Sequence, residues 1–198
     1  MEIKNYKIEE KLISATMANI YGLLMMIPVC IVFVTPFYLI WPDRLRQANF
    51  EELFARTFGQ PTGVTSFFVI ILIFLVSVVL HELIHGITWS LFTKNGFSSI
   101  RFGINWKMLM PYCHCKEPLL LRHYITGAIM PFILLGLVPT ICAIFTGSFL
   151  LLVTGLIMTI SAIGDFMIIA LIRKYPGDTL VLDHPNEAGC YIYLRENG

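Results

Sequence analysis

The stretch TSFFVIILIFLVSVVLHELIHGITWSLF, residues 65–92, decides the fold. It is long enough to cross the hydrocarbon core of a bilayer, which takes about 20 apolar residues in a helix. Glu82 is the only Asp, Glu, Lys or Arg in it. The length and apolar character predict a membrane-spanning helix. A carboxylate within such a helix needs a partner, because its burial costs about 2.5–3.5 kcal/mol.

The composition extends this interpretation to the whole chain. Of 198 residues, 57% are apolar and 14% are charged, whereas about a quarter of a typical soluble domain is charged. We therefore expect a mainly α fold, a polytopic membrane helical bundle of four transmembrane helices. The absence of repeats and linkers predicts a single domain over residues 1–198, and the absence of a basic stripe excludes nucleic acid as a partner. The four spans are expected at residues 18–41, 65–92, 123–146 and 148–172.

The basic residues orient this bundle in the lipid bilayer. Eleven of the fourteen Lys and Arg residues lie in the N-terminal segment, the loop of residues 94–122 and the C-terminal tail. The remaining three are Arg44, Arg46 and Arg56, between the first two spans. Basic residues accumulate on the cytoplasmic side of membrane proteins. We therefore expect a multi-pass protein of the cell membrane with both termini cytoplasmic.

Shorter elements are predicted in the loops. Apolar and polar residues alternate over residues 99–106 and again over residues 112–117, which predicts a small cytoplasmic-side β-hairpin. Residues 180–182 and 190–194 are expected to pair in the tail. Asn49 and Glu52 resemble a capping box, which predicts a short helix on the outer membrane surface.

The sequence His81-Glu82-Leu83-Ile84-His85 is the main chemical feature of the second span. Its two His residues are one helical turn apart and project from the same face. This spacing holds one zinc ion, and Glu82 is then placed to act as general base on a metal-bound water. Ser77 and Thr88 on the same stripe are candidates to orient the imidazoles, or else small packing residues. The apolar flanks disfavour a chance match in a solvated helix.

A catalytic zinc usually has three protein ligands, so a third is needed. Asp165 is the only other carboxylate well inside a span. His85 lies 8 residues before Thr93 and Asp165 lies 8 residues before Arg173, so each is about 12 Å from its cytoplasmic helix end. We therefore expect one Zn2+ ion on His81, His85 and Asp165. The competing candidates are Cys113, His114, Cys115, His123 and His184.

Several motifs in order carry a family resemblance. They are His81-Glu82-Leu83-Ile84-His85-Gly86, residues 112–119, Ile129-Met130-Pro131-Phe132 with Gly136 and Pro139, Gly164-Asp165 and, more weakly, Asp183-His184-Pro185. With them the chain resembles the zincin peptidase family of bacterial integral membrane proteins, which is similar to site-2 proteases. The resemblance implies intramembrane proteolysis of a membrane protein or peptide substrate. It also implies His81, His85 and Asp165 as ligands and Glu82 as the catalytic base.

The leading hypothesis is a zinc-dependent metalloprotease that hydrolyses peptide bonds near the cytoplasmic membrane face. The edge of the hairpin at residues 99–117 is a candidate to hold an extended substrate by strand addition. Two alternatives stay open: a non-catalytic membrane protein that binds a metal or a client, and an ion transporter that uses the buried site. An intact Glu82 disfavours the first alternative, because metal binding alone does not require it.

Overall fold

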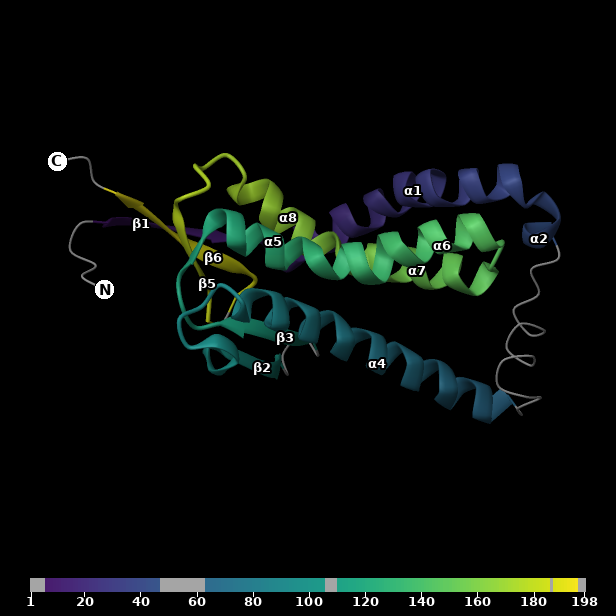
Figure 1. The fold of residues 1–198 in the computed structure, drawn as a ribbon, viewed down its shortest axis with the longest axis horizontal. Helices are drawn as coiled ribbons and strands as arrows, with labels where there is room; N and C mark the ends of the chain where they lie inside the picture. The colour runs from purple at the N-terminus through teal and green to yellow at the C-terminus, as the bar shows by residue number, and fades with distance from the viewer. Residues whose placement is uncertain (1–5, 47–62, 106–109, 186, 196–198) are drawn as a thin grey trace. The chain divides into compact units, whose positions relative to one another are not determined.

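The structure is a computed structural model that describes residues 6–46, 63–105, 110–185 and 187–195. Figure 1 labels its helices and strands. They belong to two compact units. Unit 1 consists of Met1–Leu23, Glu82–Pro131 and Ala162–Gly198, and unit 2 of Leu24–His81 and Phe132–Ser161. The predicted helix on residues 49–58 lies outside the described residues. The expectation of a single domain stays a prediction.

Three helices in the described part of the chain are long and apolar enough to cross a membrane. They are α1 (Ala15–Ile40), α4 (Gly63–Ser90) and the run Leu121–Thr146, which consists of α5 (Leu121–Pro131), the π-helical segment η3 (Phe132–Leu137) and α6 (Val138–Thr146). A short helix, α2 (Pro42–Arg46), follows α1. The mainly helical prediction is therefore confirmed, and three of the predicted spans coincide with helices that are candidates to cross a membrane.

The predicted fourth span is not one straight helix. It consists of α7 (Phe149–Ser161) and α8 (Ile163–Ile172), which are bent by 42° relative to each other. The pair passes as a fourth candidate span only if both helices are taken together. The predicted span over residues 148–172 is therefore interrupted at Ala162, the residue that separates the two helices.

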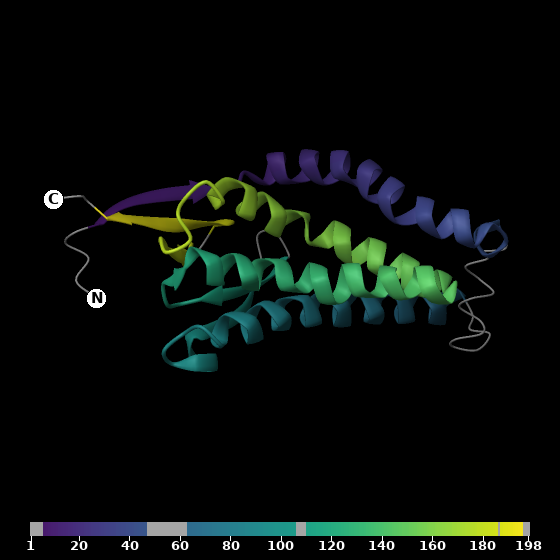
Figure 2. The ribbon, with the colours of Figure 1, turned by 45° about the horizontal axis from the view of Figure 1, so that its top comes forward.

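Unit 2 is a helical bundle with an apolar core and a glycine at one close helix contact. Its core contains Phe33, Phe37, Ala143 and Leu152, and α6 and α7 lie side by side in both ribbon views (Figures 1 and 2). A Cβ atom added at Gly155 would contact the Thr140 hydroxyl. The helices can therefore approach each other closely because a glycine lies at their contact.

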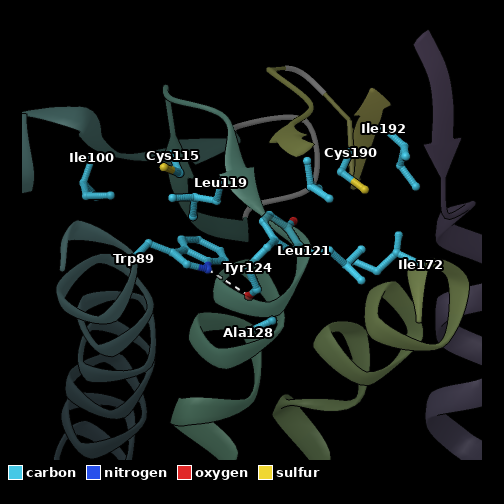
Figure 3. Close-up of a cluster of buried hydrophobic side chains, with 11 residues drawn as sticks. Trp89, Ile100, Cys115, Leu119, Leu121, Tyr124, Ala128, Ile172, Cys190 and Ile192 are labelled. Atoms are coloured by element: carbon cyan, nitrogen blue, oxygen red, sulfur yellow. Dashed lines mark hydrogen bonds between the residues drawn. The ribbon is translucent and has the colours of Figure 1, made fainter. Parts of the chain in front are cut away.

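Unit 1 contains a four-stranded antiparallel sheet in the order β1-β6-β5-β4. Its strands are β1 (Tyr6–Leu12), β4 (Leu119–Leu120), β5 (Leu180–Asp183) and β6 (Gly189–Arg195). Pairing of β5 with β6 confirms the prediction for the tail. Val181 and Ile192 are fully buried and pair with each other in this sheet. Their core also contains Ile172 of α8, which is labelled with Ile192 in Figure 3.

The predicted hairpin is also present in unit 1. Strand β2 (Ile100–Asn105) pairs antiparallel with β3 (Met110–Cys115). A short 3-10 helix, η2 (Gly96–Ser99), precedes β2. The Glu117 carboxylate accepts hydrogen bonds from the Ser99 hydroxyl, the Lys94 N–H and the Asn95 amide. These donors lower the pKa of Glu117 to about 2 and fix the loop that joins α4 to the hairpin.

Candidate metal centre

The centre begins on α4. His81 and His85 are both buried, with 7% and 4% of their surface exposed. The boundary between the two units runs between His81 and Glu82, inside one continuous helix. The helix itself therefore places His81 one turn from His85, on the same face. It ends at Ser90 rather than near Thr93, so His85 lies closer to its end than the sequence indicated.

Asp165 comes from the first turn of α8. The break after Ser161 starts a new helix, and a carboxylate in a first turn is stabilised by the unpaired N–H groups and the dipole there. The Asp165 Oδ1 atom lies 3.3 Å from His85 Nε2. One ligand atom from each of His81, His85 and Asp165 lies within 4.8 Å of the others. The three residues that the sequence singled out therefore present two nitrogens and one carboxylate oxygen together.

This donor set fits a zinc ion. Zinc bonds of about 2.0–2.2 Å at tetrahedral angles would put two ligand atoms roughly 3.4 Å apart, and the His85–Asp165 pair is at 3.3 Å. His85 Nδ1 lies 2.9 Å from the Gly127 carbonyl oxygen. Donation from Nδ1 to that carbonyl keeps the lone pair on Nε2, which is the tautomer that a metal requires.

The packing around Trp89 explains why the Gly127 carbonyl reaches His85. A Cβ atom added at Gly127 would overlap the Trp89 indole, so only glycine lets α5 approach α4 this closely. The Trp89 Nε1–H donates to the Tyr124 carbonyl at 3.0 Å (Figure 3). The indole stacks on the His85 imidazole at 5.1 Å and on the Tyr124 ring at 5.2 Å between centroids.

The hairpin packs against the same part of α4. A Cβ atom at Gly86 would lie 2.9 Å from the Ile100 side chain and would also overlap Phe102. On the neighbouring strand, burial raises the pKa of the Cys113 thiol, and the negative charges of Glu82 and Asp183 raise it further.

The other candidate ligands have different surroundings. His123 stacks on Phe92 at 4.2 Å, and His184 Nε2 lies 3.0 Å from Glu10. His114 Nδ1 is 4.0 Å from Asp183, and the thiols of Cys113 and Cys115 belong to β3. Among the described residues, the His, Cys, Asp and Glu side chains that lie close enough together to hold a metal are those of His81, His85 and Asp165.

Ser77 and Thr88 do not orient the imidazoles through the hydrogen bonds that their hydroxyls donate. Ser77 donates to the Ile73 carbonyl and Thr88 to the Ile84 carbonyl, each one turn back in α4. The packing interpretation fits them better. Sequence reasoning missed the Gly127 carbonyl as the partner of His85, because a backbone atom leaves no signature in the residue types. Trp89 and Tyr124 were also missed, since they look like ordinary apolar or interfacial residues.

A comparison with protein families gives a match. A family model described as "Putative zincin peptidase" matches residues 74–180, more than half of the chain. The matched residues contain both His residues of the motif, Glu82 and Asp165. No curated protein and no solved structure matches the chain.

Proposed function

The chain belongs to the "Putative zincin peptidase" family, and we propose that it is a zinc-dependent intramembrane metalloprotease that hydrolyses peptide bonds near the cytoplasmic membrane face. The family supports a metallopeptidase in general. The membrane setting is supported by the three to four candidate spans in the described residues, two of which carry the candidate ligands. The likeness to site-2 proteases and the cytoplasmic position of both termini are part of the same proposal.

The observation that carries the proposal is the pair formed by His85 and Asp165. The 3.3 Å between His85 Nε2 and Asp165 Oδ1 matches the distance expected between two ligands of a tetrahedral zinc ion. The other imidazole nitrogen, Nδ1, lies within hydrogen-bond distance of the Gly127 carbonyl oxygen. His81 would supply the third ligand, so a zinc ion held by these three residues would still be able to bind a water molecule. His81, His85 and Asp165 are therefore the proposed zinc ligands.

The chemistry follows from this arrangement. Zinc bound there would lower the pKa of a water molecule and polarise the scissile carbonyl. Glu82 is the proposed general base: it takes a proton from the attacking water and passes it to the leaving amine. The low polarity of the surrounding apolar residues strengthens each of these electrostatic interactions.

The substrate would bind in extended form along the free edge of β3. The Lys116 N–H donates to the Ser99 carbonyl, and N–H groups alternate in direction along a strand. The N–H groups of Cys113 and Cys115 therefore point away from β2. In the described part of the chain, β3 pairs with β2 alone, so its outer edge is open to an added strand.

The register of that added strand is restricted at both ends. The Cys115 N–H already donates to Asp183 Oδ2 at 2.9 Å, and Pro111 has no N–H to donate. Cys113 is then the residue of this edge that can offer both its N–H and its carbonyl. We propose that a substrate residue pairs with Cys113, which Glu82 influences electrostatically.

The test uses the full chain purified in detergent and comparative proteomics of membrane fractions. We expect about one zinc per chain in the wild type and in Glu82→Gln, with cleavage lost in Glu82→Gln because the base is absent. Glu187→Gln, which changes an exposed carboxylate, is the matched control and should cleave normally.

Three outcomes separate the alternatives. Cleavage of a validated substrate by Glu82→Gln would overturn the hydrolase assignment. Retention of the zinc by His81→Ala and Asp165→Ala would overturn the proposed ligand set. Zinc that crosses proteoliposomes without staying bound would favour a transporter over a fixed site.

A further inference from the structure

We infer that Asp183, in the C-terminal tail, is a positioning residue for the His85 imidazole and acts through Tyr124 and Trp89. The inference rests on the proposed metal site and extends it to the tail. Asp183 lies three residues beyond the part of the chain that the family model matches, so the family match gives it no role.

Asp183 joins three elements of unit 1. Only 8% of its surface is exposed. Its Oδ1 atom accepts a hydrogen bond from the Tyr124 hydroxyl at 2.5 Å, and its Oδ2 atom accepts one from the Cys115 N–H at 2.9 Å. A buried carboxylate is costly unless both oxygens are paired. These two contacts therefore hold β5, α5 and β3 in one arrangement.

The connection continues from Tyr124 to the proposed ligand. Tyr124 is 2% exposed and Trp89 is 5% exposed, so both rings are fixed by close packing. Tyr124 contacts Trp89 twice, through ring stacking and through its carbonyl, which accepts the indole N–H (Figure 3). The indole in turn stacks almost parallel to the His85 ring, with 16° between the planes.

The same helix also supplies the second contact of His85. Gly127, whose carbonyl lies 2.9 Å from His85 Nδ1, is three residues after Tyr124 on α5. A shift of Tyr124 would therefore move both the indole behind the imidazole and the carbonyl that sets its tautomer. Partners of this kind orient metal ligands and affect metal affinity without touching the metal.

The experiment compares two variants with a packing control in the full chain. Asp183→Asn removes the carboxylate charge and one acceptor, and Tyr124→Phe keeps the ring stack but removes the hydroxyl. Val181→Ala is the control, because Val181 is fully buried two residues earlier on the same strand and face. Zinc affinity is measured by competition with a chelator, and the geometry of the ligands by the visible spectrum of bound Co2+.

We expect Asp183→Asn and Tyr124→Phe each to weaken zinc binding by roughly tenfold, the lower end for partners beyond the ligands. Both should shift the Co2+ absorption bands. Val181→Ala should lower the melting temperature but leave the zinc affinity and the Co2+ spectrum unchanged. A purely structural role of Asp183 would not predict this difference between the control and the two variants.

Four results would overturn the inference. The first is unchanged affinity and spectrum in both variants, and the second is an equal shift in Val181→Ala. The third is loss of folded protein in both variants, since that assigns Asp183 a structural role alone. The fourth is a wild-type chain that binds neither Zn2+ nor Co2+, which would overturn the proposed function as well.

Discussion

The two units bring their helices together in different ways. In unit 2, small residues lie at the contact of α7 with η3 and α6. The Thr140 hydroxyl there donates a hydrogen bond to the Gly136 carbonyl, four residues earlier in the same run of helix. In unit 1, buried polar bonds run between elements, from His85 to Gly127 and from Tyr124 to Asp183. Shape alone holds two helices close, but it tolerates small rotations. Directional bonds fix ring orientation, which a metal ligand requires.

Both units nevertheless depend on a glycine at the closest approach, which permits a matched test. A Cβ atom at Gly127 would overlap the Trp89 indole, and one at Gly155 would overlap the Thr140 hydroxyl and lie 2.8 Å from the Gly136 carbonyl oxygen. We expect Gly127→Ala and Gly155→Ala each to lower the free energy of unfolding by about 1–3 kcal/mol through overpacking. Only Gly127→Ala should weaken zinc binding, because only that variant moves the partner of His85.

Thermal unfolding and zinc competition on the same preparations check this prediction. Gly22→Ala is the control, since nothing lies within 4 Å of its added Cβ. It should be neutral or stabilising by about 0.5–1 kcal/mol, as expected for alanine in a helix. An equal loss of zinc affinity in Gly155→Ala would remove the distinction between the two units.

The parts of the fold that sequence could predict are those with a local signal. Apolar length indicates α1 and α4, and alternation indicates the strands of the hairpin and the tail. Strand β1 was missed because its partner β6 lies at the other end of the chain, and alternation alone does not identify a distant partner. The bend at Ala162 was missed because no proline lies at the break, and helix geometry there depends on packing.

The candidate site divides in the same way. The motif indicates His81, Glu82 and His85 because a single helix sets their spacing. Asp165 could be predicted as a ligand from its position deep in a span, since a lone carboxylate there needs a partner. Gly127, Trp89 and Tyr124 could not be predicted, because their contribution arises from a backbone carbonyl and from stacking between two helices. Such contacts exist only after the chain has folded.

The loop that joins α4 to the hairpin offers a second test of the difference between the two units, and this test depends on pH. Hydrogen bonds lower the pKa of Glu117 from 4.5 to about 2. A carboxyl group whose pKa is lower in the folded state stabilises the fold fully above the unfolded value, and that stabilisation is lost as the pH falls from about 4.5 towards 2. Glu117→Gln should therefore melt below the wild type at pH 7, and the difference should shrink as the pH approaches 3.

A variant in unit 2 supplies the comparison for this measurement. Trp41→Phe removes the hydrogen bond from Nε1 to the Ile144 carbonyl at 2.9 Å, which involves no titrating group. Its loss of about 1 kcal/mol should be the same at each pH. If the difference for Glu117→Gln stayed constant with pH, or that for Trp41→Phe varied with it, unit 1 would not be the pH-sensitive region that its polar contacts indicate.

The smallest effect is expected at Thr159, on the α7 side of the unit 2 contact. Its side chain is 3% exposed, and its hydroxyl has no hydrogen-bond partner within the described residues. Burial of an unpaired hydroxyl costs about 1–3 kcal/mol, so Thr159→Val should be neutral or slightly stabilising. Thr140→Val should instead lose about 1 kcal/mol, because Thr140 donates to the Gly136 carbonyl at 2.9 Å.

Thermal unfolding of the two variants in the same detergent measures the difference. The contrast requires that Thr140→Val is destabilised and Thr159→Val is not, because the two residues have the same chemistry and nearly the same burial but differ in hydrogen bonding. A destabilised Thr159→Val would mean that this hydroxyl has a directional role. A polar contact would then help to orient α7, and small residues alone would no longer explain how α7 packs against α6 and η3.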